Sequence, residues 1–136
     1  MAVWTCPSCD RQFGKINQSH LCAPGISIAA YFADRPPVQR LICDAVLDHL
    51  ETLGPVIVDP VDVGILIKRV RTFAELRAKR DRVALSMILP RTVHDPRIAR
   101  RIAVSGPRVA HFVNLVVVED VDDQLREWLA ESYFET

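Results

Sequence analysis

The stretch Gly64–Pro90, GILIKRVRTFAELRAKRDRVALSMILP, predicts three successive β-strands and so decides the fold. Its clearest part is Arg82–Leu89, where every second residue is large and apolar, as expected of one buried strand face. The turn before this strand is Lys79–Asp81. Because the connections between these strands are too short for helical crossovers, we expect the sheet to be antiparallel.

Further strands are expected on both sides of this stretch. Residues 56–58 (VIV) lie between prolines, which favours the edge of a sheet. Residues 108–118 alternate like a strand, with His111 on the same face as apolar neighbours. Residues 91–107 carry little pattern, and there Ile98 and Ile102 indicate a turn of helix.

Two main helices are expected. Residues 37–53 have apolar residues at helical spacing, open with proline and are followed by Gly54 and Pro55. Asp120 is the predicted N-cap of a final helix, and Ser27 that of a brief helix over residues 28–33. The sequence therefore predicts an α+β fold. It comprises an antiparallel sheet of about five strands with two main helices packed on one face, plus a short N-terminal zinc knuckle. The expected domains are residues 1–24, the knuckle, and 25–136.

The knuckle is predicted from residues 4–22, WTCPSCDRQFGKINQSHLC. Their spacing, C-x2-C-x10-H-x-C, offers four ligands of the kind that zinc prefers: Cys6, Cys9, His20 and Cys22. His20 and Cys22 should bind from an extended segment, because residues two apart point to the same side only there. Trp4 and Phe13 supply apolar support. Four protein ligands leave no position for water, so we expect a structural Zn²⁺.

A redox dithiol is the alternative for Cys-Pro-Ser-Cys, but such motifs follow a βα unit and no strand of useful length precedes Cys6. The remaining cysteine, Cys43, borders the apolar stripe of residues 37–53 and is interpreted as a small buried hydrophobe.

Composition places the chain among globular proteins: 136 residues, of which 49% are hydrophobic and 25% charged. No signal peptide is visible in residues 1–26, and no apolar run is long enough to span a membrane, so we expect a cytoplasmic protein. Phosphate-binding glycine loops, nucleophile elbows and H-E-x-x-H pairs are absent from the sequence, which favours a binding protein over an enzyme.

Charge is unevenly distributed along the chain although the net charge is zero. Residues 68–108 hold 12 basic and three acidic residues, or +9, whereas residues 119–136 hold seven acids and one arginine, or −6. Clustered cations attract phosphates whatever the base sequence, so we expect an anionic partner such as nucleic acid on a basic sheet surface. The candidate anion-binding residues are Arg69, Arg71, Arg80, Arg82, Arg108 and His111.

Other interpretations of this charge stay open. The arginines can simply be solvated or pair with the acidic helices, and His111 can be a hydrogen-bonded core histidine. The chain can also be a protein-interaction or oligomerising adaptor, including a homodimer. A third alternative is a domain that holds a small anionic ligand through Arg69, Arg71, Arg108 and His111.

Several short motifs resemble a bacterial family known only as domain of unknown function 5655. They include Trp4–Pro7 with the other metal-ligand candidates, Leu53–Val56, Leu89–Arg91 and the closing Trp128-Leu129. The resemblance covers most of the chain and implies that a small zinc-binding segment precedes the domain. It implies no reaction; related domains occur beside nuclease-like modules, which favours nucleic-acid contexts.

Overall fold

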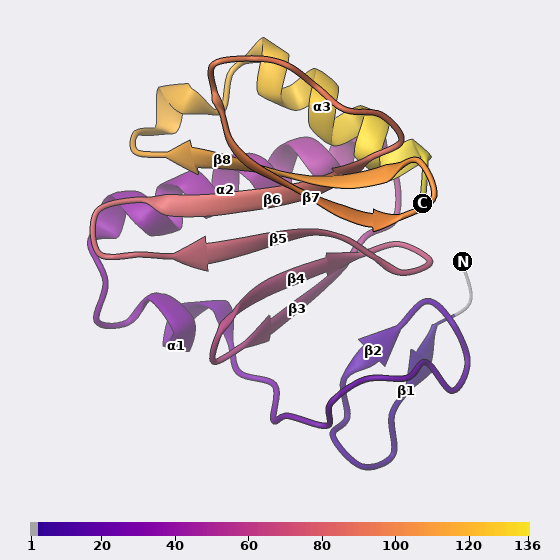
Figure 1. Ribbon diagram of the computed structural model, residues 1–136. Helices are drawn as coiled ribbons and strands as arrows, with labels where there is room; N and C mark the ends of the chain where they lie inside the picture. The colour runs from indigo at the N-terminus through magenta and orange to yellow at the C-terminus, as the bar shows by residue number, and fades with distance from the viewer. Residues whose placement is uncertain (1–2) are drawn as a thin grey trace.

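The computed structural model describes residues 3–136; residues 1 and 2 of the predicted knuckle lie outside the described residues. A six-stranded antiparallel sheet dominates the fold (Figure 1). Its strands lie in the order β3 (Ile57–Val61), β4 (Gly64–Lys68), β5 (Thr72–Ala78), β6 (Val83–Leu89), β8 (Arg108–Leu115) and β7 (Ile98–Ser105). The three strands predicted within Gly64–Pro90 are therefore confirmed as β4, β5 and β6.

Two main helices, α2 (Pro37–Leu53) and α3 (Asp123–Phe134), pack on one face of the sheet (Figure 1). The shorter helices are α1 (Ile28–Phe32) and η1 (Val118–Asp120). The bounds predicted for α2 are confirmed, and Ser27 caps α1 by accepting a hydrogen bond from the Ala30 amide. Within residues 3–136, no helix has both the length and the apolar character needed to cross a membrane.

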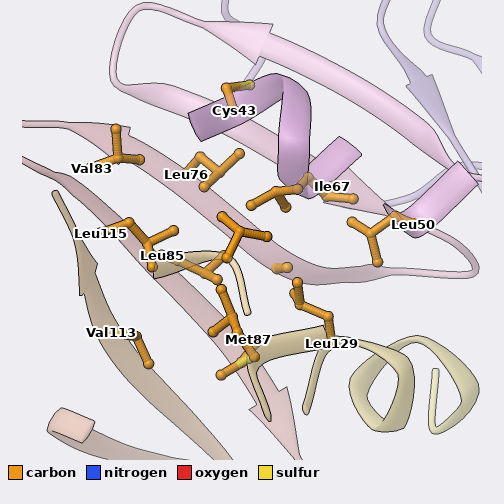
Figure 2. Close-up of a cluster of buried hydrophobic side chains, with 14 of the residues drawn as sticks. Cys43, Leu50, Ile67, Leu76, Val83, Leu85, Met87, Val113, Leu115 and Leu129 are labelled. Atoms are coloured by element: carbon orange, nitrogen blue, oxygen red, sulfur yellow. The ribbon is translucent and has the colours of Figure 1, made fainter. Parts of the chain in front are cut away.

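The core lies between the helices and the inner face of the sheet (Figure 2). On β6 the burial alternates as its sequence predicts, and the inward residues are fully buried against Leu50 of α2 and Leu129 of α3. Each such side chain stabilises the fold by roughly 1.5–3 kcal/mol. The fully buried residues of β6 are Val83, Leu85, Met87 and Leu89.

The turn of helix predicted around Ile98 and Ile102 is wrong. Residues 98–105 form the edge strand β7, joined to β8 by a tight turn in which Gly106 adopts a left-handed φ of 53°. Seven of the eight residues of β7 are exposed, because little packs on either of its faces. An edge strand of this kind has no alternating apolar pattern from which it could be predicted.

The predicted cap of the final helix is also wrong. Asp122, not Asp120, is the N-cap of α3 and accepts a hydrogen bond from the Leu125 amide at 3.0 Å. That hydrogen bond and the Arg97 guanidinium keep the pKa of Asp122 low. Asp120 instead accepts hydrogen bonds from the Val116 and Val117 amides at 2.7 and 3.1 Å and closes the turn that forms η1.

Candidate metal centre and basic surface

A small β-hairpin positions the first two cysteines. Strands β1 (Trp4–Thr5) and β2 (Gln12–Phe13) pair antiparallel, and the intervening turn is closed by the Cys6 amide donating to the Arg11 carbonyl at 2.9 Å. Asp10 donates to the Cys6 carbonyl at 2.8 Å and adopts a left-handed φ of 60°. Aspartate tolerates this conformation better than most residues, which suits it to this turn.

The four predicted ligands lie together, with their ligand atoms all within 4.8 Å of one another. Sγ of Cys6 and Sγ of Cys22 are 3.8 Å apart, and Nε2 of His20 is 3.4 Å from the Sγ atoms of both Cys9 and Cys22. Tetrahedral zinc, with bonds of ~2.3 Å to sulfur and ~2.0 Å to nitrogen, requires ligand separations of ~3.8 Å and ~3.5 Å. The Cys3His cluster is therefore compatible with a bound metal ion.

The imidazole of His20 is oriented for coordination through Nε2. Its Nδ1 lies 2.6 Å from the Gln18 carbonyl, which can only accept a hydrogen bond, so Nδ1 carries the proton. The Nε2 lone pair is then free for a metal, as in metal sites whose histidines are held by a backbone carbonyl. Phe13 lies 4.1 Å from His20 between ring centroids and Trp4 lies 6.1 Å away, so both predicted aromatic supports flank the ligand.

Crowding of the thiols opposes their joint ionisation in the absence of a cation. Burial tends to raise the pKa of Cys6, but the Ser8 and Cys9 amides outweigh it and bring the pKa to about 6. The hydrogen bond with Cys6, burial and the charge on Cys6 raise the pKa of Cys22 to about 11. A metal ion among them would stabilise all three as thiolates, the form in which cysteine is a ligand.

The knuckle is joined to the sheet by a buried network of charges. Asp59 of β3 accepts hydrogen bonds at Oδ2 from Nε of Arg11 at 2.8 Å and from Nζ of Lys68 at 2.6 Å. Nζ of Lys68 also lies 3.2 Å from the Gln12 carbonyl and 3.6 Å from the centroid of Phe13. Arg11, Asp59 and Lys68 are each less than 9% exposed, so this network joins the knuckle to the sheet through buried charges.

The docked knuckle covers part of the outer face of the sheet, the face opposite α2 and α3. A Cβ at Gly14 would lie 2.1 Å from the Arg69 carbonyl, so only glycine permits this approach to the β4–β5 turn. The outward residues Ile57, Asp59 and Val61 are buried on β3, and Arg11 of the knuckle binds Asp59 there. Residues 3–136 leave the outer face of β5, β6, β8 and β7 uncovered; we call it the open half-face.

Removing the central carboxylate should destabilise the whole chain. We expect Asp59→Asn to lower the free energy of unfolding by roughly 3–5 kcal/mol, because it leaves the buried Lys68 and Arg11 without a counter-charge. Asp44→Asn, which breaks an exposed pair with Arg40, is the matched control and should cost at most about 0.5 kcal/mol. Urea unfolding of both variants measures the difference. Equal small losses would contradict the role given to Asp59.

The six candidate anion-binding residues do not form one surface. Arg71 and Arg108 lie together at the end of the sheet where β5 begins, beside the C-terminal end of α3. Arg80 and Arg82 lie in the turn between β5 and β6, at the opposite end of these strands. Arg69 stacks on Tyr133, with its guanidinium carbon 4.6 Å from the ring centroid, and donates to the Tyr133 carbonyl.

Two other basic residues of the same stretch are neutralised by α3 and its cap. Arg91 makes a two-point hydrogen bond with Glu131, at 2.9 and 3.0 Å, and Arg97 binds Asp122 at 2.8 Å. The interpretation in which arginines pair with the acidic helices therefore holds for Arg91 and Arg97. Cations that could bind an external anion are instead found on the open half-face.

Three cations that the sequence did not single out meet in a groove on the open half-face, of about 270 Å³. The outward position of Arg77 could have been predicted from the alternation of residues along β5. That of Arg100 could not, because the sequence did not identify β7 as a strand. The groove is lined by Glu75, Arg77, Lys79, Ala84, Ser86, Arg100 and Phe112.

His111 is fully buried on the inner side of β8. Its Nδ1 donates to the Val109 carbonyl at 2.9 Å, and its Nε2 accepts from the Val93 amide at 2.9 Å. This ring anchors the loop before β7, as expected of a core histidine, and has no surface with which to contact an anion. Burial lowers the pKa of His111, and the hydrogen bond to Val109 only partly opposes this.

The buried histidine should make folding sensitive to mild acid. The pKa of His111 is lower in the folded chain than in the unfolded chain. As the pH falls through about 6.5, the unfolded chain therefore binds a proton at this ring before the folded chain does, and the free energy of unfolding falls. We expect His111→Gln to be less stable at neutral pH but to show a flatter decline between about pH 7 and about pH 5. Urea unfolding across that range compares the two proteins, which share the same metal ligands. A parallel decline would show that His111 does not contribute.

The fold and the cluster define this protein as an α+β domain with a docked N-terminal Cys3His hairpin. Residues 28–135 match the family model described as "Domain of unknown function (DUF5655)", and the chain belongs to this family. The match begins at α1 and leaves the cysteine hairpin outside it. Comparison with curated proteins and with solved structures gave no match in either case.

Metal content gives a direct check on the cluster. We expect the wild-type chain to purify with nearly stoichiometric zinc and Cys22→Ser to lose most of it, because three ligands bind more weakly and leave the site open. Cys43→Ala is the matched control, since burial raises the pKa of that thiol to about 12 and it lies in the core. Elemental analysis reads out the metal. Equal loss from both variants, or a metal-free wild type, would contradict the assignment.

Proposed function

We propose that this protein is a zinc-stabilised binding module that contacts an anionic partner, nucleic acid, through its open half-face. Three thiolates and one imidazole form a donor set that favours zinc over the harder divalent cations. With four protein ligands the ion has a structural role, and the binding surface lies on the sheet beside it.

The observation that carries this proposal is a set of five cationic side chains, three on the open half-face and two at the end of the sheet beside the C-terminal end of α3. Among the described residues, only Arg77 of this set has a carboxylate partner, Glu75. The two ends of the surface are both cationic. The set comprises Arg77, Lys79 and Arg100 in the groove, and Arg71 and Arg108 at the other end.

The spacing of these cations favours a partner with repeated charges. From Ser86 in the groove to Pro90 beside Arg108 is four residues of extended chain, or ~13 Å at ~3.3 Å per residue. Ile88 and Ala110 pair with each other between the two cationic ends. A single small anion cannot reach both ends, whereas a phosphate backbone offers a charge to each.

A small anion held by Arg71 and Arg108 is the second candidate. Both residues line a cavity of about 230 Å³ that Glu135 also lines, and neither makes an ion pair within residues 3–136. Burial, and then the nearby charge of Arg71, lower the pKa of Arg108, so an anion placed between them would be stabilised. An acidic protein partner would bind the same cations, and competition with polyglutamate distinguishes it from nucleic acid.

Binding to mixed-sequence nucleic acid should weaken steeply with salt. We expect Arg77→Gln, Lys79→Gln and Arg100→Gln each to lower the slope of log affinity against log salt by about one. Arg40→Gln on α2 is the matched control, because it removes a partly exposed arginine from the opposite side of the molecule. Filter binding across a salt series measures the slopes, with polyglutamate as competitor.

Two results would contradict this proposal. The first is an affinity for nucleic acid that does not change with ionic strength, since phosphate contacts release counterions. The second is an equal loss in Arg40→Gln and the three groove variants. Efficient competition by polyglutamate at matched charge would favour the acidic protein partner instead.

A further inference from the structure

We infer that the groove on the open half-face takes an unpaired nucleotide, with the base stacked beside Phe112 and Arg100 and the phosphate held by Arg77 and Lys79. The partner is then single-stranded nucleic acid and not a duplex. This inference rests on the proposed function and makes it more specific.

A single row of side chains crosses four strands and forms the groove. Glu75 of β5 pairs with Ser86 of β6, Ser86 with Phe112 of β8, and Phe112 with Arg100 of β7. Residues in register across neighbouring strands have side chains on the same face. The row therefore places an acid, a small hydroxyl, an aromatic ring and a guanidinium side by side on the open half-face.

The centre of the groove is low because its residues are small. Ala84 and Ser86 form the floor on β6, between the side chains of β5 and Phe112 of β8. The strands β5 and β8 are two strand spacings apart, or ~9.6 Å, which is wide enough for one flat ring between their side chains. A volume of about 270 Å³ is also of the size of one nucleotide rather than of a longer segment.

One wall of the groove is a stack of two planar groups. The guanidinium carbon of Arg100 lies 4.3 Å from the centroid of the Phe112 ring. Both groups are surfaces on which nucleobases stack, and Arg100 remains charged at any pH relevant to proteins. Arg100 makes no ion pair within residues 3–136, so its guanidinium and the Phe112 ring are available to a ligand.

The charges within the groove set the direction of the nucleotide. Glu75 lies in the row and repels phosphate, whereas Lys79 lies at the end of β5 with no carboxylate partner among residues 3–136. Because Glu75 is bound to Nε of Arg77, a phosphate is favoured at the Lys79 end, where the other guanidinium nitrogens of Arg77 can still donate, and the base is favoured beside Phe112. A base that belongs to a duplex is stacked and paired inside the helix and cannot enter a groove of this kind.

The test compares a fluorescein-labelled oligothymidine with its duplex on oligodeoxyadenosine, by fluorescence anisotropy at one salt concentration. We expect the single strand to bind at least about tenfold more tightly, and Phe112→Leu to weaken it by about tenfold. Phe112→Trp should restore the affinity, because it restores an aromatic surface. Phe134→Leu, an exposed phenylalanine at the end of α3, is the matched control and should change nothing.

Free thymidine monophosphate serves as competitor and separates a nucleotide site from a strand site. Competition at concentrations near the oligonucleotide affinity would mean that the groove takes single nucleotides. Equal binding of single strand and duplex, unaffected by Phe112→Leu, would overturn this inference while leaving the proposed function in place. If neither nucleic acid binds, both fail. Thermal unfolding of each variant shows whether a loss of binding reflects a loss of folding.

Discussion

The carboxylate of Asp59 is the interaction on which the arrangement of the molecule depends. It binds Arg11 of the knuckle and Lys68 of β4 in a buried site, so two cations face one anion. The surplus charge is met by the carbonyls of Gln12 and Leu21 and by the face of Phe13. Separating the knuckle from the sheet would break the pair between Arg11 and Asp59 and take from Lys68 its contacts with Gln12 and Phe13.

Phe13 links this network to the metal cluster. One ring lies 3.6 Å from Nζ of Lys68 and 4.1 Å from the centroid of His20, so the ring contacts both the ion network and a ligand. A metal that holds His20 in place therefore also holds Phe13 over Lys68. A knuckle this short has little apolar surface of its own to bury, so a metal ion in the cluster would act together with Asp59 to keep the outer face of β3 and β4 covered.

The sequence predicted what depends on periodicity and spacing. The alternation in Arg82–Leu89 and the bounds of α2 follow from local rules, and so does the grouping of Cys6, Cys9, His20 and Cys22; the structure agrees with all three. It did not predict β7, because an exposed edge strand has no apolar face to produce a pattern. Nor did it predict the Asp59 network, since pairing Arg11 with a residue 48 positions away depends on how the knuckle docks.

Charge along the chain is a poor guide to charge in space, and the arginines here show why. Arg91 and Arg97 lie on the loop beside α3 and are neutralised by Glu131 and Asp122. Arg77 and Arg100 lie on the opposite face, because alternation along β5 and β7 turns them away from the acidic helices. The sheet thus separates Arg91 and Arg97, which pair with α3 and its cap, from Arg77 and Arg100, of which Arg77 pairs with Glu75 on its own strand. An anionic partner would contact only the arginines that face away from the helices. The side of the sheet to which each arginine points, which is set by its position along the strand, is therefore more informative than the total charge.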